Sequence, residues 1–386
     1  MRSSRVPHGE ATSRLARAIA ARRAEGVPLC DLSITNPTAV GLPYPADALR
    51  RALGGPCPLV YEPEPLGLPV ARAAVARETG ARADRVALCA STSEAYAWLF
   101  KLCCDAGDDV LVPQPSYPLF EHLAGLENVS ANPYALRFSE DRWELDVAHI
   151  AERIGLRTRA IVVVHPNNPT GSFIRTHEAD ALRALCERHQ LVLVSDEVFG
   201  AYPLFDDPGR AGVLARDSPC LTFSLGGLSK QCGLPQLKLG WIEVGGPDGL
   251  VTEALLDLEL VADTYLSVGA PVQHALPALL EAGRGIRAAI VTRVRTNLEA
   301  LTRAASASQL ARVLPVEGGW SALLQLPATR SDEDAALELL EAGVLVQPGW
   351  LYDLDRHGTF VLSLLPPPLD FVTALDRIVD VARGWL

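Results

Sequence analysis

The sequence predicts an α/β fold: a large domain with a mostly parallel sheet flanked by helices, and a smaller α+β domain. Short runs rich in Val and Leu do not alternate with polar residues, which is typical of strands buried on both faces. Helical patterns separate several of these runs, and alternation of strand and helix favours a parallel sheet. The predicted strands are residues 85–89, 109–113, 160–165, 191–197, 220–224 and 239–244.

Two helices are predicted between these strands, at residues 93–108 and 177–190. Gly107 and Asp108 close the first of them, as a helix end requires. Beyond about residue 250, long helical stretches alternate with a few strand-like runs, which indicates a second domain. The helical stretches expected there are residues 251–268, 286–307, 331–342 and 370–384, and the strand-like runs are 321–327, 343–348 and 359–365.

We expect the large domain to comprise residues 36–265, and the small domain to comprise residues 1–35 and 266–386. A basic amphipathic helix is predicted from Ala11 to Arg23, and it leads directly into "VPLCDLSI". We therefore expect this helix to dock on the body of the protein, although an organelle-targeting role is an alternative. It lacks the apolar core of a secretory signal, and no stretch approaches the roughly 20 apolar residues of a membrane span.

The formal net charge of −11 repels nucleic acid and anionic membranes, so neither is expected as a partner. The eight cysteines form no C-x-x-C pair, and most lie in apolar runs. This is typical of reduced core cysteines in a cytoplasmic protein, with no disulfide framework and no zinc site. Composition therefore favours a cytoplasmic protein that acts on small molecules without a bound metal.

Polar clusters follow the predicted strands at the points where ligands bind in open parallel sheets. The predicted helix begins at Ser91, Thr92 and Ser93, and the backbone N–H groups of a helix N-terminus can bind an anion. The alternative is that these residues only cap the helix. Asp196 ends an apolar strand, where an unpaired carboxylate is costly, so it needs a cationic or N–H partner. An ion pair within the fold is the alternative. Lys230 follows a glycine-rich loop and can bind a phosphate or act as a nucleophilic amine.

Two further clusters complete the set: Tyr117 lies between prolines, and Asn168 lies in a turn. Each is ordinary loop chemistry alone, and the G-x-x-x-x-G-K-[ST] nucleotide loop is absent. Together the clusters describe one ligand, with an anionic group at a helix N-terminus and a flat ring under Tyr117. Its basic ring nitrogen would lie at Asp196 and its electrophilic carbon at Lys230. Pyridoxal phosphate has these features.

The sequence resembles the fold-type I pyridoxal-phosphate aminotransferases of class I/II, from about Asp31 to the C-terminus. Three motifs carry the resemblance: "HPNNPTG" at residues 165–171, "SDEVF" at 195–199 and "GGLSKQCGLPQLKLGW" at 226–241. They occur in the order and at the spacing of that family. The resemblance implies the fold of that family and pyridoxal 5′-phosphate as the cofactor.

The resemblance also implies roles for single residues. Lys230 would form the Schiff base with the cofactor, and Asp196 would keep the pyridine nitrogen protonated. Asn168 would donate a hydrogen bond to the phenolic oxygen, and Tyr117 would stack on the ring. Such a site moves an amino group to a 2-keto acid by ping-pong kinetics, with Lys230 shuttling the proton.

The phosphate site is implied in the same way. Ser91, Thr92 and Ser93 would cradle the phosphate. Lys238 stands where the family usually has an arginine, and it supplies a point charge in place of a bidentate fork. Tyr61 matches a tyrosine that reaches the phosphate of the neighbouring subunit, so a homodimer is expected.

Three positions depart from the family pattern. Phe199 replaces a common tyrosine and removes one hydrogen bond to the phenolic oxygen. Gly227 stands where a serine often helps to bind phosphate. Val361 stands where the family has the arginine that grips the substrate α-carboxylate. We therefore expect either a substrate without this carboxylate or a replacement donor, for which Arg356 and His357 lie closest in sequence.

Two alternatives to an aminotransferase remain open. A pyridoxal-phosphate lyase, for example one that eliminates across a carbon–sulfur bond, would reuse the same residues. A non-catalytic cofactor-binding module is the other alternative, but the presence of both Lys230 and Asp196 argues against it.

Overall fold

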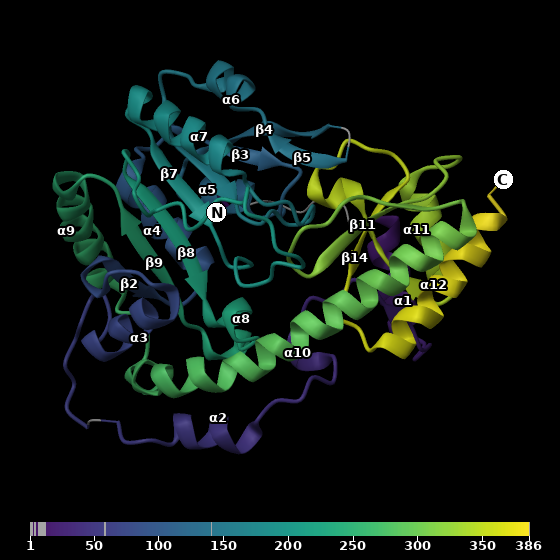
Figure 1. Ribbon diagram of the computed structural model, residues 1–386, viewed down its shortest axis with the longest axis horizontal. Coiled ribbons are helices and arrows are strands. Elements are labelled where there is room, and N and C mark those ends of the chain that lie inside the picture. The colour runs from purple at the N-terminus through teal and green to yellow at the C-terminus, as the bar shows by residue number, and fades with distance from the viewer. Residues whose placement is uncertain (1–2, 4, 7–12, 58, 140, 386) are drawn as a thin grey trace.

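The computed structural model describes residues 3, 5–6, 13–57, 59–139 and 141–385. Its large sheet has eight strands, and Figure 1 shows helices on both sides of it. The strands are β2 (Val86–Cys89), β3 (Asp109–Gln114), β4 (Ser130–Ser139), β5 (Arg142–Leu145), β6 (Thr158–Val164), β7 (Val192–Asp196), β8 (Thr222–Gly227) and β9 (Gly240–Gly245). Their order is β2-β9-β8-β7-β6-β3-β4-β5. The β8-β7-β6-β3-β4 pairs are parallel and the outer pairs antiparallel, so the predicted mostly parallel sheet is confirmed.

Both faces of this sheet are covered, which explains the continuous apolar runs. Val110 and Val162 pack on the side of helices α4 (Thr92–Cys103), α5 (Phe120–Leu126) and α9 (Asp248–Tyr265). Leu111 and Leu193 pack on the opposite side, against α6 (Val147–Arg153) and α7 (Thr176–His189). Adjacent residues of one strand thus enter different cores, as the pleat requires.

A second, antiparallel sheet has the strand order β10-β11-β14-β13. Its strands are β10 (Arg312–Val313), β11 (Ser321–Gln325), β13 (Gln347–Pro348) and β14 (Thr359–Ser363), and α11 (Asp332–Glu341) and α12 (Pro368–Arg383) lie beside it in Figure 1. A two-stranded parallel ladder joins β1 (Cys30–Asp31) to β12 (Val344–Leu345). The predicted smaller α+β region is therefore confirmed.

The N-terminal helix α1 (Arg14–Ala24) docks on α11. Ser13 caps it by accepting a hydrogen bond from Ala16 N at 3.1 Å. Leu15 N donates to Glu333 Oε1 at 3.2 Å, and Arg14 forms an ion pair with Asp334 at 3.0 Å. Docking on the body of the protein is as expected, while residues 11 and 12 of the predicted helix lie outside the described residues.

One helix, α10 (Ala270–Ser308), runs from α2 (Ala46–Leu53) and α3 (Pro69–Thr79) to α12 (Figure 1). The sequence analysis was wrong to begin this helix at residue 286. Pro277 and Gly283 interrupt the helical pattern, but both lie inside the helix. Gly283 is needed there, because an added Cβ would collide with Cys232. The helix crosses from one sheet to the other, so the domain limits given above stay a prediction.

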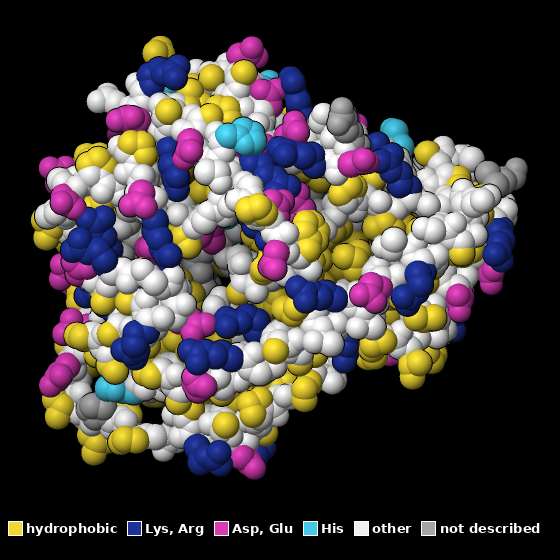
Figure 2. Space-filling view, in the orientation of Figure 1, with side chains coloured by type: hydrophobic (Ala, Val, Ile, Leu, Met, Phe, Trp, Pro, Cys, Tyr) yellow, Lys and Arg dark blue, Asp and Glu magenta, His cyan; other side chains and the backbone are white. Residues whose placement is uncertain are grey.

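The hairpin of β4 and β5 was not predicted. Its strands lie at the edge of the large sheet, and Tyr134 is the only fully buried residue of β4. A strand with a single buried side chain lacks the continuous apolar run of a central strand. None of the described helices is long and apolar enough to cross a membrane. On the face shown in Figure 2, basic and acidic side chains are interspersed.

Candidate active site

A cavity of about 480 Å³ lies where the large sheet faces the small one. It receives residues from the carboxyl ends of β6, β7 and β8 and from the small-domain strands β11 and β13. Of the residues predicted for the site, all but Tyr61 line it. They are Ser91, Thr92, Ser93, Tyr117, Asn168, Asp196, Phe199, Lys230 and Lys238.

One end of the cavity is formed by the N-terminus of α4. Ser91 Oγ accepts a hydrogen bond from Glu94 N at 3.2 Å, and Glu94 Oε2 accepts one from Ala90 N at 2.6 Å. This reciprocal capping leaves other N–H groups of the first turn without a helical partner. Among the described residues, the hydroxyls of Thr92 and Ser93 also have no partner within hydrogen-bond distance. The helix end thus presents several donors, and its dipole favours an anion.

Lys238 adds a positive charge to this cavity. It adopts a left-handed backbone conformation with φ of 48° after a short 3₁₀ turn, Pro235–Leu237. In the described part of the chain, no carboxylate lies within ion-pair distance of its ammonium group. An unpaired cation beside a helix N-terminus makes this end of the cavity suitable for a phosphate.

Asp196 ends β7 between β6 and β8 and faces the cavity. Its carboxylate accepts hydrogen bonds from Val198 N and from the Tyr96 hydroxyl, each at 3.2 Å. Burial raises the pKa of Asp196 to about 6, and these two donors and the charge of Lys230 act in the opposite direction. No described Lys or Arg lies within ion-pair distance of it. A cationic N–H group in the cavity would complete the coordination of this carboxylate.

Lys230 lies on the short helix α8 (Leu228–Gln231), which follows β8 directly. Its Nζ lies 5.5 Å from the centroid of the Phe199 ring and 5.1 Å from that of the Trp320 ring. Removal from water lowers the pKa of Lys230, and the negative charge of Asp196 opposes this. The Tyr202 hydroxyl donates to the Lys230 carbonyl at 2.6 Å and fixes the backbone. The amine is therefore desolvated and faces the cavity without an ion pair.

Asn167 and Asn168 are neighbours with different surroundings. Asn167 is buried: its Nδ2 donates to Pro115 O at 3.2 Å, and its Oδ1 accepts from Thr170 N at 3.2 Å. Asn168 lines the cavity, and no described residue is hydrogen-bonded to its amide. Tyr117 lines the cavity as well and is half-exposed. The free amide and the accessible ring suit a planar ligand with a polar substituent.

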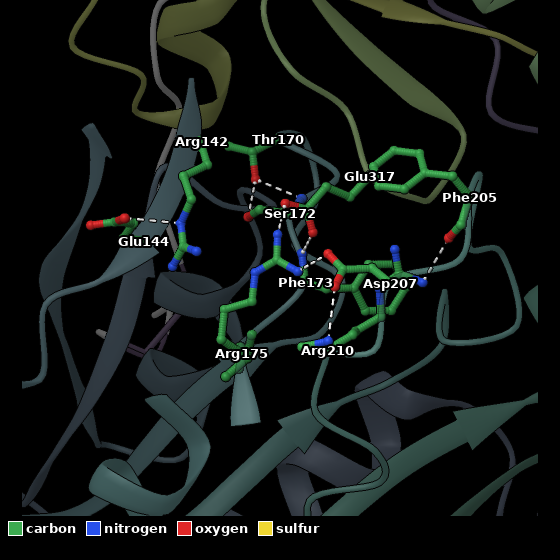
Figure 3. Close-up of polar contacts among 12 residues, drawn as sticks. Arg142, Glu144, Thr170, Ser172, Phe173, Arg175, Phe205, Asp207, Arg210 and Glu317 are labelled. Atoms are coloured by element: carbon green, nitrogen blue, oxygen red, sulfur yellow. Dashed lines mark hydrogen bonds and ion pairs between the residues drawn. The ribbon is translucent and has the colours of Figure 1, made fainter. Parts of the chain in front are cut away.

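A partly buried charge network links loops that lead to residues of this cavity (Figure 3). The Arg175 guanidinium lies between the carboxylates of Asp207 and Glu317, and its distance to Glu317 Oε1 is 2.7 Å. The side chains of Arg175 and Glu317 are only 13% and 8% exposed. Glu317 N also donates to Gly171 O at 3.2 Å. The network therefore joins the loop that carries Asn168 to the loop before β11.

Several cavity residues were missed by sequence reasoning. They are Thr35, Tyr96, Ser229, Trp320, Ser321, Gln347 and Tyr352. Tyr96 lies one helical turn after Ser93, and Ser229 precedes Lys230, so their spacing could have indicated them. The other five come from segments far from the motifs, and we find no sequence pattern that would have placed them here.

Tyr61 lies away from this cavity. Its side chain is 76% exposed, and it borders a second cavity of about 380 Å³ together with Leu59, Val60 and Leu266. The structure therefore separates Tyr61 from the cofactor-suited residues of its own chain.

The three residues considered for the substrate carboxylate also lie elsewhere. Val361 is 1% exposed and packs with Leu323 of the small sheet and Trp143 of the large sheet. Arg356 stacks over the Phe138 ring at 4.8 Å from its centroid. Neither Arg356 nor His357 is among the cavity-lining residues. The expectation that one of them could serve as the replacement donor is wrong for this cavity.

This fold and this set of cavity residues define an α/β transferase of the pyridoxal-phosphate type. The family model of aminotransferase class I and II matches residues 62–359, so the chain belongs to that family. It is an enzyme of the aminotransferase class, and the predicted family and fold type are confirmed.

Known proteins agree with this assignment. An alanine aminotransferase of Mycobacterium tuberculosis is 28% identical over 373 residues, which cover 92% of this chain and 86% of that protein. The solved alanine aminotransferase from Pyrococcus furiosus shares the fold with a TM-score of 0.87 at 22% identity, over 100% of both chains. A Thermus thermophilus aspartate aminotransferase mutant has a TM-score of 0.84 at 25% identity, over 99% of this chain and 100% of that one.

Proposed function

We propose that the chain binds pyridoxal 5′-phosphate in this cavity and uses it to move an amino group from an amino acid or amine to a 2-keto acid. One observation carries the proposal: Lys230 and Asp196, neither of which forms an ion pair with a described residue, line the same cavity as the anion-suited end of α4. When bound, the cofactor supplies a protonated pyridine ring that withdraws electrons from the substrate Cα–H bond.

Lys230 is the nucleophile and then the base. Its lowered pKa favours the neutral amine, the form that would hold the aldehyde group of the cofactor and yield that position to a substrate amine. The free amine would then be the base that accepts the proton of the substrate Cα and later donates it again. Asp196 holds the proton on the ring nitrogen, and Tyr96 keeps the Asp196 carboxylate in place.

The remaining cofactor contacts follow the same geometry. Lys238 and the N-terminus of α4, with Ser91, Thr92 and Ser93, bind the phosphate. Asn168 donates to the phenolic oxygen and Tyr117 stacks on the ring. Phe199 offers the phenolic oxygen no hydrogen bond, so Asn168 alone is assigned to it.

We further propose a homodimer in which Tyr61 reaches the phosphate of the partner subunit. The support is an exposed apolar stretch: Leu59, Val60 and Tyr61 are 103%, 71% and 76% exposed. Helix α9 adds the exposed Leu256 and Leu260. Large apolar side chains of this kind favour burial against another chain.

The relatives named above as alanine and aspartate aminotransferases make small amino acids the first donors to test. The cysteine pattern supports a cytoplasmic location.

We also propose the domain limits given above, residues 36–265 for the large domain and residues 1–35 and 266–386 for the small domain. The strands of the large sheet fall within the first range, and those of the small antiparallel sheet fall within the second.

The test is a half-reaction. The holoenzyme is mixed with an amino donor without acceptor, and the absorbance of the aldehyde form of the cofactor is followed. We expect this absorbance to fall and to return when 2-oxoglutarate is added, and Lys230→Arg should abolish the change. Release of pyruvate and ammonia without any acceptor would instead indicate a lyase and contradict the proposal.

A further inference from the structure

Beyond the residues assigned to the cofactor, the cavity continues toward the small sheet. Thr35, Ser321, Gln347 and Tyr352 form the polar part of this wall. Among the described residues that line the cavity, only Lys230 and Lys238 are cationic, and the proposed function commits both. A substrate carboxylate would therefore meet no arginine or free lysine of this chain at that wall.

Gln347 contributes the amide group of this wall. It lies in β13, opposite Val361 of β14 in the antiparallel register. The buried Tyr352 hydroxyl donates to Gln347 Oε1 at 2.8 Å. Because Oε1 already accepts this hydrogen bond, Nε2 is the atom of the amide that can bind a ligand in the cavity. No described residue accepts a hydrogen bond from it, so its two N–H donors are free.

The rest of this wall is uncharged as well. Thr35 is exposed and Ser321 is half-buried, and no described residue is hydrogen-bonded to either hydroxyl. On the adjacent wall lie the Phe199 and Trp320 rings, packed edge to face at 5.3 Å between centroids. This half of the cavity thus combines neutral donors with aromatic surface.

We propose that Gln347 anchors the substrate by donating from Nε2 to an acceptor oxygen, and that the site accepts this oxygen from a carboxylate or from an uncharged amide. The inference rests on the proposed function. A neutral N–H group forms a stronger hydrogen bond with a carboxylate than with an uncharged amide, but the carboxylate loses more hydration on entry. The two effects oppose each other, so a neutral anchor discriminates little between charged and uncharged acceptors.

The experiment compares L-alanine with L-alaninamide in the half-reaction of the holoenzyme. The quantity measured is the ratio of their apparent second-order rate constants. The ratio in each variant is compared with the ratio in the wild type, so the different basicities of the two amines drop out of the comparison. Gln347→Glu keeps the shape and the bond from Tyr352, but adds a negative charge. We expect it to lower the alanine-to-alaninamide ratio by about tenfold or more.

Gln347→Arg supplies the missing cation and should raise this ratio by about tenfold or more. Gln347→Leu removes the donors and should slow both substrates with little change in the ratio. Gln325→Glu is the matched control, because Gln325 lies in the neighbouring strand β11 but does not line the cavity. Its ratio should equal that of the wild type.

Binding of propionate and propionamide, measured by calorimetry, gives a readout independent of turnover. The ratio of their dissociation constants should shift in Gln347→Glu and Gln347→Arg in the same directions as the rate ratio. Unchanged ratios in both variants would overturn the role of Gln347. Failure of every amine to alter the cofactor absorbance of the wild type would instead overturn the proposed function itself.

Discussion

Lys230 Nζ lies 5.1 Å from the centroid of the Trp320 ring, although the two residues are next to strands of different sheets. Trp320 immediately precedes β11 of the small sheet, whereas Lys230 follows β8 of the large one. The Phe199 ring, which packs edge to face on Trp320, has its centroid 5.5 Å from the same Nζ. Because these rings exclude water from the amine, the placement of the small sheet helps to set the basicity of Lys230.

The first prediction concerns this enclosure. Trp320→Leu should admit water and raise the pKa of Lys230 toward its ordinary value. The measurement is the pH dependence of Lys230 acetylation in the cofactor-free protein, followed by mass spectrometry. Trp350→Leu is the control, because Trp350 is exposed and does not line the cavity. An unchanged midpoint in Trp320→Leu would show that the ring does not desolvate the amine.

The second prediction concerns the charge network in Figure 3. Arg175→Met leaves the carboxylates of Asp207 and Glu317 without their shared cation, so the free energy of unfolding should fall by more than it does when an exposed ion pair is removed. Arg383→Met, which removes an exposed ion pair with Asp380, should cost less than about 1 kcal/mol. Urea unfolding of both variants measures the difference. Equal losses of unfolding free energy in Arg175→Met and Arg383→Met would show that the network does not stabilise the fold more than an exposed ion pair does.

The third prediction follows from Asp196. Burial raises its pKa from 3.8 to about 6, so the folded cofactor-free chain binds this proton more tightly than the unfolded chain. The stabilisation by this proton is complete below about pH 4 and is lost as the pH rises toward 6. The Asp196→Asn variant does not lose stability in this way, because its amide does not ionise. Without cofactor it should therefore gain stability over the wild type between pH 4 and 7, on the order of 1–3 kcal/mol.

Urea unfolding at a series of pH values, after removal of the cofactor, checks this sign. A difference between Asp196→Asn and wild type that does not change with pH would show that the carboxylate is ionised at no cost. With cofactor added, the order should reverse, because the wild type gains the contact between Asp196 and the ring nitrogen.

The fourth prediction concerns Lys238. Lys238→Ala should weaken binding of pyridoxal phosphate by about 1.5–3 kcal/mol, the usual worth of a charge-assisted contact. Fluorescence titration of the cofactor-free protein gives the dissociation constant. Lys101→Ala is the control, since Lys101 forms an ion pair with Glu127 and does not line the cavity. If Lys238→Ala binds pyridoxal phosphate with the same dissociation constant as the wild type, Lys238 does not contact the phosphate.

The parts of the fold that could be predicted share one property: their pattern is local. Buried central strands such as β6 appear as continuous apolar runs, and Asp196 and Lys230 follow such runs directly. The start of α10 could not be predicted, because Pro277 and Gly283 both favour a helix end locally, whereas the structure keeps both inside the helix and places Gly283 against Cys232.

The substrate side of the cavity was beyond sequence reasoning for a related reason. Gln347 and Trp320 reach it through the docking of the small sheet on the large one, which no local pattern encodes. Arg356 was chosen for its nearness in sequence to Val361. The direction of its side chain, onto the Phe138 ring, depends on the fold of the loop before β14.

The central claim is that Lys230 carries the cofactor, and the composition of the chain permits a direct test. The chain contains only three lysines, Lys101, Lys230 and Lys238. The holoenzyme is reduced with borohydride, digested and mapped by mass spectrometry. The account predicts that the reduced cofactor is found on the peptide containing Lys230 and on neither of the other two lysines. Attachment to Lys238 or Lys101, or no covalent attachment in a fully loaded enzyme, would contradict it.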